Sequence, residues 1–333
     1  MDNASKPLIL SSSPHFHSRY TTEKAMREVV LALLPAAAAG IWFFGYRAIL
    51  VMLASIAGAL AAEVLCLKIR KRPITDGSAA VTGLLLALCL PPGIPLWTAF
   101  LGGVFAIVIG KQVFGGLGQN IFNPALIGRA LLLASFPNQM ASWMPARGAG
   151  LAQATGAMGI DAITSATPMV FLKEGAMHQL PSLLDSALGQ ISGSIGETSV
   201  VALLIGGAFL IVRKHIDWKI PVLYLGTLMG ISLIYTAVMG YGLLFPLYQL
   251  CSGGLMLGAF YMATDWVTSP VTKKGRLVYG LGLGLMTCLI RFFGGLAEGV
   301  CYSILIMNAL TPLIDRYMRG KIFGVKGKGG SPT

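Results

Sequence analysis

The chain has 333 residues, of which 55% are hydrophobic and only 11% are charged, and its formal net charge is +12. A soluble domain carries roughly a quarter charged residues, so this chain has too few to cover a surface that faces water. Its basic residues stand in short clusters between apolar runs, without the basic stripe and interleaved aromatic residues of a nucleic-acid-binding protein. The composition therefore indicates a protein that crosses a membrane several times and binds no nucleic acid.

Residues 1–27 are polar and are expected to form a cytoplasmic N-terminal arm. The arm lacks the charged, apolar and small-residue regions of a cleavable signal peptide. His15 and His17 have no third ligand nearby, so we expect no metal site. The five cysteines are not spaced as Cys-x-x-Cys, which argues against an iron–sulfur cluster held by this chain alone. We interpret them as ordinary buried cysteines, with one or two facing a partner subunit as the alternative.

Ten apolar runs follow, each near the length of about 20 residues that crosses a bilayer. We expect an all-α integral membrane protein of about ten transmembrane helices, five in residues 28–136 and five in residues 199–315. A basic cytoplasmic tail, residues 316–333, ends the chain. The predicted spans are residues 28–45, 48–67, 77–92, 96–113, 121–136, 199–213, 220–239, 245–264, 277–294 and 298–315.

Lysine and arginine residues set the expected orientation. Twenty of the 25 fall in every second connecting segment, including both ends of the chain. Connecting segments rich in lysine and arginine stay in the cytoplasm, so both termini are expected there. Residues 137–198 then form a long loop on the outer side of the membrane.

The two groups of helices resemble each other in sequence. Phe-Gly-Gly-Leu at residues 114–117 recurs at residues 293–296, and Ala-Leu at 130–131 recurs at 309–310, both at an offset of 179 residues. Because five spans is an odd number, the second group enters the membrane from the opposite side. The pattern predicts two inverted repeats, with Phe-Gly-Gly-Leu breaking a helix in each and binding sites between them. Chance similarity between glycine- and leucine-rich helices is the alternative.

Ionisable residues in or beside membrane spans usually face a polar interior, which makes them candidates for a site. Glu63, Lys111 and Asp265 are our candidates for an ion path. Arg129, which with Glu63 lies deepest, is interpreted either as binding a phosphate or as pairing with a carboxylate. Most of these residues stand near a predicted helix end, where a long side chain can reach the membrane surface. The full set is Glu63, Asp76, Lys111, Arg129, Asp265, Arg291, Glu298 and Asp315.

The outer loop, residues 137–198, is long, and it is too apolar for a disordered linker. We expect it to fold back onto the helices. Within it, Thr167 and Pro168 precede the apolar run 169–172. A hydroxyl residue followed by proline predicts a helix that begins with Thr167 as its N-cap. An anionic group on the Thr167 hydroxyl would lie at the positive end of that helix.

Residues 161–167 read Asp-Ala-Ile-Thr-Ser-Ala-Thr. This resembles the Asp-x-x-(Ser/Thr)-Gly-Ala-(Thr/Ser) signature of proteins that carry FMN in phosphoester linkage to the last residue. The resemblance implies that a flavin transferase attaches FMN to Thr167, with Asp161 as a recognition residue. Thr164, Ser165 and Ala166 would present the threonine to the transferase; Ser165 stands where glycine is common.

Further blocks resemble, in order along the chain, the family that unites the RnfD component of the Rnf electron-transport complex with the NqrB component of the sodium-pumping NADH:quinone reductase. They are residues 13–15, 76–78 with 82–83, 110–120, 122–125, 262–265 and 268–270. The resemblance implies a subunit of a ferredoxin- and NAD-linked, redox-driven translocase of Na⁺ or H⁺ in a bacterial inner membrane, with residues 137–198 in the periplasm. Its partners would be iron–sulfur and flavin subunits, and the family suggests a second, non-covalent flavin between helices, with riboflavin as the candidate.

The short N-terminal arm favours the Rnf branch of this family, and the quinone-reductase component is the alternative within it. No residue is assigned to catalysis beyond holding the flavin. Two further alternatives lie outside the family. One is a secondary transporter or channel for a small solute built on inverted repeats, and the other is a membrane scaffold whose outer loop docks a partner.

Overall fold

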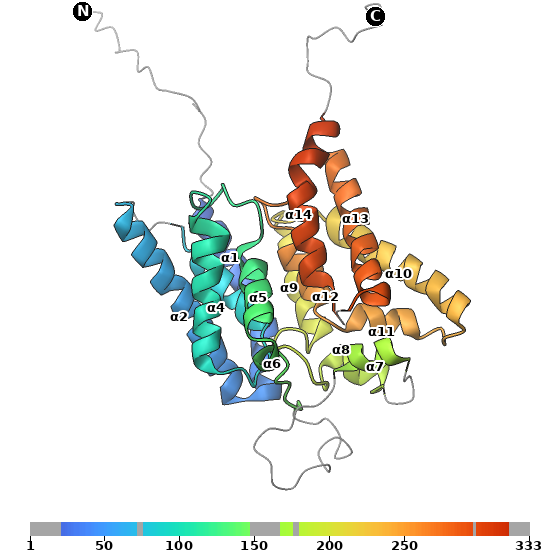
Figure 1. Ribbon diagram of the computed structural model, residues 1–333. Coiled ribbons are helices and arrows are strands. Elements are labelled where there is room, and N and C mark those ends of the chain that lie inside the picture. Colours follow the sequence, from blue (N-terminus) through green and yellow to red (C-terminus); the bar gives the residue numbers. More distant parts are fainter. Residues whose placement is uncertain (1–20, 72–75, 147–166, 176–179, 296–297, 320–333) are drawn as a thin grey trace, which may run out of the picture.

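The computed structural model describes residues 21–71, 76–146, 167–175, 180–295 and 298–319. In these ranges the chain is helical and forms no β-strand (Figure 1). Four described helices are long and apolar enough to cross a membrane: α1 (Thr22–Phe44), α2 (Tyr46–Ile69), α10 (Lys219–Met239) and α13 (Lys273–Phe293). The prediction of a helical, multi-pass membrane protein is confirmed, whereas the count of ten spans in two repeats stays a prediction.

The other helices are shorter, and each predicted span overlaps one helix or more. In the first half they are α3 (Ser78–Leu88), α4 (Leu96–Ile107), the π-helix η1 (Val108–Gln112) that continues it, α5 (Pro124–Ser135) and α6 (Pro137–Met140). Then come α7 (Pro168–Glu174), α8 (Leu183–Leu188), α9 (Val200–Val212), α11 (Phe245–Cys251), α12 (Leu255–Leu257), the π-helix η4 (Gly258–Met262) and α14 (Val300–Tyr317).

The start of α1 differs from the predicted span 28–45. The helix begins at Thr22, because the hydroxyl of Thr21 accepts a hydrogen bond from the Lys24 backbone N–H at 3.3 Å and so caps the first turn. Part of the expected N-terminal arm is therefore the polar first turn of a helix. The rest of the arm, residues 1–20, lies outside the described residues.

The predicted span 245–264 is not one continuous helix. It is interrupted after α11 at Ser252, Gly253 and Gly254, and the chain resumes with α12 and η4. Gly253 and Gly254 have φ values of +75° and +63°, a backbone conformation that glycine adopts without the steric cost of a Cβ atom. The two Phe-Gly-Gly-Leu segments were predicted to break a helix in each half. Instead, each lies where a helix ends: the first is in the turn after η1, and the second begins at the last residue of α13.

Small residues allow the helices to pack closely. In the first half α2 packs against α4, where a Cβ atom on Gly103 would lie 2.3 Å from the carbonyl oxygen of Ser55. In the second half α10 packs against α13, where a Cβ on Gly284 would lie 2.5 Å from that of Thr227. Such contacts are typical of helices packed in a membrane. Contacts of α1 with α9 and of α5 with α14 join the halves around one buried core.

The outer-loop helices α7 and α8 pack on α11, as the prediction of a loop folded back onto the helices requires. Figure 1 shows them at the end of the bundle opposite to the C-terminal end of α14. The helix break at residues 252–254 follows α11 directly, so it lies beside this outer-loop layer.

Candidate functional site

Thr167 is the N-cap of α7, as predicted, and Pro168 occupies the first helical position. Its backbone is extended, with φ −79° and ψ 154°, and its side chain makes no capping hydrogen bond within the described part of the chain. The residue is only 9% exposed. Its hydroxyl is therefore held at a buried helix start without the usual backbone partner.

An apolar cluster fixes α7 in place. Met169 and Leu172 on α7 are buried against Phe245 of α11. Around them the rings of Tyr235 and Phe292 stack with centroids 4.3 Å apart and planes at 6°. Because these rings belong to the ends of α10, α11 and α13, α7 is anchored on the second half of the molecule.

Thr167 lines a small cavity of about 10 Å³. The walls come from α7, from residues 191–197 before α9, from the break at Ser252 and Gly253, and from Glu298. A space of this size holds roughly one water molecule. The fold thus places the predicted attachment residue at the break between α11 and α12.

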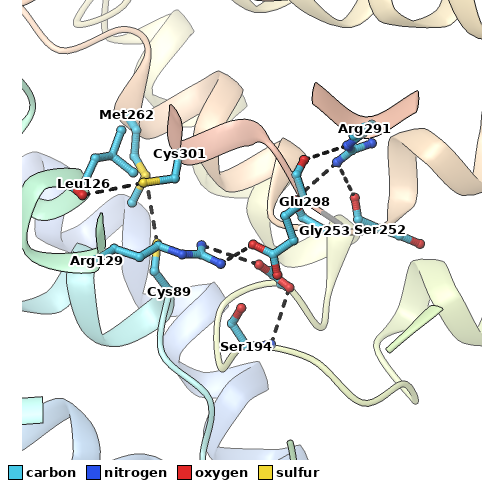
Figure 2. A network of polar contacts seen from close by, with 11 residues as sticks. Cys89, Leu126, Arg129, Ser194, Ser252, Gly253, Met262, Arg291, Glu298 and Cys301 are labelled. Atoms are coloured by element: carbon cyan, nitrogen blue, oxygen red, sulfur yellow. Dashed lines mark hydrogen bonds and ion pairs between the residues drawn. The ribbon is translucent and has the colours of Figure 1, made fainter. Parts of the chain in front are cut away.

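Arg129 reaches this region from α5, in the other half of the molecule. Its side chain is paired with Glu298 (Figure 2). Its Nη1 also lies 3.8 Å from Oε1 of Glu197. The sequence left open whether Arg129 pairs with a carboxylate or binds a phosphate. The pairing is present, and it involves two carboxylates that both line the Thr167 cavity.

Arg291 from α13 holds the helix break. Its Nη1 donates to the backbone oxygen of Gln249 at 2.6 Å and to that side chain's Oε1 at 2.9 Å. Its Nη2 donates to the backbone oxygens of Ser252 at 3.0 Å and Gly253 at 3.3 Å, and its Nε donates to that of Glu298 at 2.9 Å. Figure 2 shows Arg291 and Arg129 on opposite sides of Glu298. The arginine supplies the hydrogen bonds that an unbroken helix would have made within itself.

Two polar atoms in the cavity wall have no hydrogen-bond partner among the described residues: Oε1 of Glu197 and Oγ of Ser252. Glu197 stands between α8 and α9, where Oε2 accepts a long hydrogen bond of 3.4 Å from the Ser194 backbone. Burial, and then the neighbouring Glu298 carboxylate, raise the pKa of Glu197, while the charge of Arg129 opposes the shift. Buried polar atoms are rarely left without partners, so the cavity suits a further hydrogen-bonding group.

The remaining motif residues, Asp161, Thr164, Ser165 and Ala166, lie outside the described residues. Sequence reasoning did not select Glu197 or Ser252. The only local signals were an acidic residue just before an apolar helix and a serine beside two glycines. Their importance depends on contacts with residues far away in the sequence.

The ion-path candidates divide into two places. Lys111, in η1, is paired with Glu63 of α2, lies 3.0 Å from Oδ2 of Asp76 and donates to Oγ of Ser78 at 2.6 Å. Asp265 stands apart from this cluster, after η4, and accepts a hydrogen bond of 3.1 Å from the hydroxyl of Thr268. Lys111 and Glu63 are 2% and 3% exposed, so the interpretation that side chains near helix ends reach the membrane surface is wrong for Lys111.

A second cavity, of about 380 Å³, brings Lys111 and Asp265 together. Its walls are mainly apolar and come from both halves: α1, α3 and η1 on one side, α9 and η4 on the other. Polar groups from Ser78, Asn120 and Asn123 also line it, whereas Glu63 is not among its lining residues. This size and composition are typical of a pocket for a small organic ligand.

In the part of the chain that the structure describes, no group of three or more His, Cys, Asp or Glu side chains could hold a metal ion. The five cysteines are free thiols. Cys301 donates to the backbone oxygen of Leu126 at 3.5 Å, and Cys89 lies 4.0 Å from the sulfur of Met262, close to Arg129 in Figure 2.

Comparison with known proteins gives a consistent family. The profile of the NQR2, RnfD, RnfE family matches residues 9–324. The D subunit of the Na(+)-translocating ferredoxin:NAD(+) oxidoreductase complex of Acetobacterium woodii is 45% identical over 324 residues, 96% of each chain. The D subunit of the proton-translocating ferredoxin:NAD(+) oxidoreductase complex of Clostridium ljungdahlii is 44% identical, over 95% of this chain and 96% of its own. The D subunit of the ion-translocating oxidoreductase complex of Citrobacter koseri is 41% identical, over 95% of this chain and 98% of its own. The chain therefore belongs to the NQR2, RnfD, RnfE family.

Proposed function

We propose that this chain is the flavin-carrying membrane subunit of an ion-translocating ferredoxin:NAD⁺ oxidoreductase complex, with FMN joined through its phosphate to Thr167. The observation that carries the proposal is the position of Thr167. Its hydroxyl lies at a buried helix start without a capping bond in the described part, in a cavity with two partnerless polar atoms. The names of the relatives support the complex.

The residues at the cavity fit a phosphoester linkage. Oγ of Ser252 is a hydrogen-bond donor that has no partner among the described residues, and phosphate oxygens are strong acceptors. The cavity, of about 10 Å³, holds no more than one phosphate oxygen, so the rest of the linkage and the ring would lie outside it. Arg129 and Arg291 bring positive charge to the walls. Asp161, Thr164, Ser165 and Ala166 are proposed to present Thr167 to a flavin transferase.

FMN supplies the redox chemistry, since it accepts one or two electrons and so connects two-electron carriers with iron–sulfur centres. The chain's own residues hold the flavin in place. Thr167 provides the covalent bond, the cluster around Met169 and Leu172 fixes its helix, and Arg291 fixes the break beside it. Partner subunits with iron–sulfur clusters and a second FMN would supply and accept the electrons.

The cavity of about 380 Å³ is our candidate for a second, non-covalent flavin, with riboflavin as the form that the family suggests. Its mainly apolar wall with a few polar groups suits an aromatic ring with a polar chain. We assign the ion path to the same region, through Lys111 and Asp265, with Glu63 acting through Lys111. The coupled ion stays open, because relatives of 45% and 44% identity are named for Na⁺ and for protons.

We further propose ten membrane spans in two inverted repeats, with both termini in the cytoplasm and residues 137–198 in the periplasm. Lys111 and Arg291 support the repeats. Lys111 stands three residues before the first Phe-Gly-Gly-Leu, and Arg291 stands two residues before the second. The extra residue in the first half lies in the π-helix η1, whose hydrogen-bonded turn is one residue longer than that of an α-helix. Lys111 binds Ser78 at the start of α3, and Arg291 binds the chain just before α12. In both places the helix is preceded by a glycine with φ +63°, Gly77 or Gly254.

The test of the flavin assignment is ultraviolet fluorescence of the denatured protein in a gel, after co-expression with a flavin transferase. The wild type should fluoresce, Thr167→Ala should be dark, and Thr167→Ser, which keeps a hydroxyl, should fluoresce. Intact mass should show FMN added with loss of water. Covalent flavin on Thr167→Ala would contradict the assignment. A dark wild type together with solute transport by the isolated chain in liposomes would favour a transporter that uses the larger cavity.

A further inference from the structure

Glu197 differs from the other charged groups near Thr167. Glu298 is tightly paired with Arg129, and Arg291 has five hydrogen-bond acceptors. Glu197 reaches Arg129 only at 3.8 Å, through Oε1, and that atom accepts no hydrogen bond from any described residue. Since Glu197 is 7% exposed, its carboxylate is largely shielded from bulk solvent.

The charges in this place are balanced before any ligand is added. Two arginines lie near two carboxylates: Arg129 pairs with Glu298 and Glu197, and Arg291 binds the backbone of Glu298. Cys89 also lies close to this group from the end of α3. A phosphodiester on Thr167 would add one negative charge to the same buried cavity. An extra uncompensated charge is costly in a buried cavity, so one of the carboxylates is expected to bind a proton.

We infer that Glu197 binds a proton when Thr167 carries a phosphodiester, and that its neutral carboxyl group then donates a hydrogen bond to the ester. This rests on the proposed function. The proton comes from the outer aqueous phase and converts the carboxylate to a carboxylic acid, with no other bond formed or broken. Glu197 is the group placed for this role, because it lines the cavity and has a free acceptor atom within the described structure. It is a positioning residue for the flavin phosphate, not a redox group.

The raised pKa of Glu197 agrees with this role, since burial and Glu298 already favour its neutral form over the opposing charge of Arg129. Arg291 and Cys89 lie further along the same network. A second anion on Thr167 moves the pKa in the same direction. Burial already raises the pKa of Glu197 to about 7, so loading with flavin at neutral pH should be accompanied by uptake of less than one proton per chain.

The test uses the full-length chain, purified with and without flavin transferase in the expression host and labelled with ¹³C in its glutamate carboxyl groups. The infrared difference between the two forms should contain the carbonyl band of a protonated carboxylic acid, shifted by the label. Flavin carbonyl bands carry no label and do not shift. The band should be lost in Glu197→Gln and kept in Glu23→Gln, a control in which an exposed glutamate that does not line the cavity is changed.

Thermal unfolding provides a second readout. A carboxyl group whose pKa is raised in the folded state destabilises the protein as pH rises towards that value. The gain in Tm on flavin attachment should therefore decline with rising pH in the wild type and in the exposed-glutamate control Glu23→Gln, and it should be independent of pH in Glu197→Gln. A labelled band or a pH-dependent gain that survives in Glu197→Gln overturns the inference alone. A wild type without covalent flavin, despite the transferase, overturns the proposed function and this inference with it.

Discussion

The molecule contains two buried charge clusters that are built differently. In the Lys111 cluster, one ammonium group is surrounded by Glu63, Asp76 and Ser78, and each of these is bonded to it directly. Both clusters border a cavity, but in the Arg129 cluster (Figure 2) one carboxylate oxygen, Oε1 of Glu197, is left without a hydrogen bond in the described structure. We call the Lys111 cluster closed, because its charged groups are bonded to one another. We call the Arg129 cluster open, because an oxygen atom of Glu197 is still able to form a hydrogen bond with a ligand.

The largest effect is expected at Arg291. Arg291→Lys should destabilise the protein by roughly 3 kcal/mol or more, because an ammonium group cannot replace the guanidinium fork and leaves buried carbonyl oxygens unpaired. Unfolding in detergent, followed by circular dichroism, measures the change. Arg276→Lys is the matched control, since Arg276 is partly exposed, pairs with Asp217 and donates only one hydrogen bond to the backbone, to the oxygen of Pro270. Equal effects at the two positions would show that Arg291 does not hold the helix break.

Breaking the closed cluster should have an effect of similar size. Lys111→Met leaves the buried Glu63 carboxylate without its cation, and removal of one partner of a buried pair costs about 3–5 kcal/mol. The double variant Lys111→Met/Glu63→Gln should recover part of that loss, because no unpaired charge remains. A double variant no more stable than Lys111→Met in the same unfolding assay would contradict the closed-cluster interpretation.

Two glycines allow the clusters to be compared directly. Gly77 and Gly254 both have φ +63° and precede α3 and α12. Alanine in this backbone conformation costs about 1–2 kcal/mol at either position. At Gly77 the new Cβ meets no described atom within 4 Å, whereas at Gly254 it would lie 2.6 Å from Oε1 of Glu197. Gly254→Ala should thus lower Tm more than Gly77→Ala, and it should also reduce flavin loading.

The smallest effect is expected for the surface pair of Asp217 and Arg276, which serves as a reference for both clusters. Although burial opposes ionisation, the hydrogen bond from Arg276 and that from the Lys219 backbone lower the pKa of Asp217. The pair's contribution to the free energy of unfolding is therefore present above the unfolded-state pKa of about 3.9. It is lost as the pH falls through the lower pKa that Asp217 has in the folded protein. Asp217→Asn should change stability at neutral pH by less than about 1 kcal/mol, and the difference from wild type should shrink in acid.

The sequence predicted what depends on local composition. Apolar runs located the helices, and the pair Thr167–Pro168 predicted the start of α7. It did not predict the interruption at residues 252–254, because small polar and glycine residues are also common inside continuous membrane helices.

Long-range contacts explain the other differences. Lys111 stands near a helix end, which suggested exposure, but Glu63 and Asp76 from distant parts of the chain bury its charge. Glu197 is part of the site because α5 places Arg129 beside it, and this contact cannot be predicted from the sequence around Glu197. Such pairings depend on how distant segments pack together, so the residues next to each partner in the sequence do not predict them.

The Arg129 cluster also has a mechanical consequence. Arg129 extends from α5 of the first half, whereas Glu197, Glu298 and the anchored helix α7 belong to the outer layer and the second half. The Arg129–Glu298 ion pair joins the two halves beside the cavity that Thr167 lines, whereas the aromatic cluster joins α7 to the second half alone. A displacement of one half relative to the other would therefore change the ion pair while Thr167 kept its place on the second half.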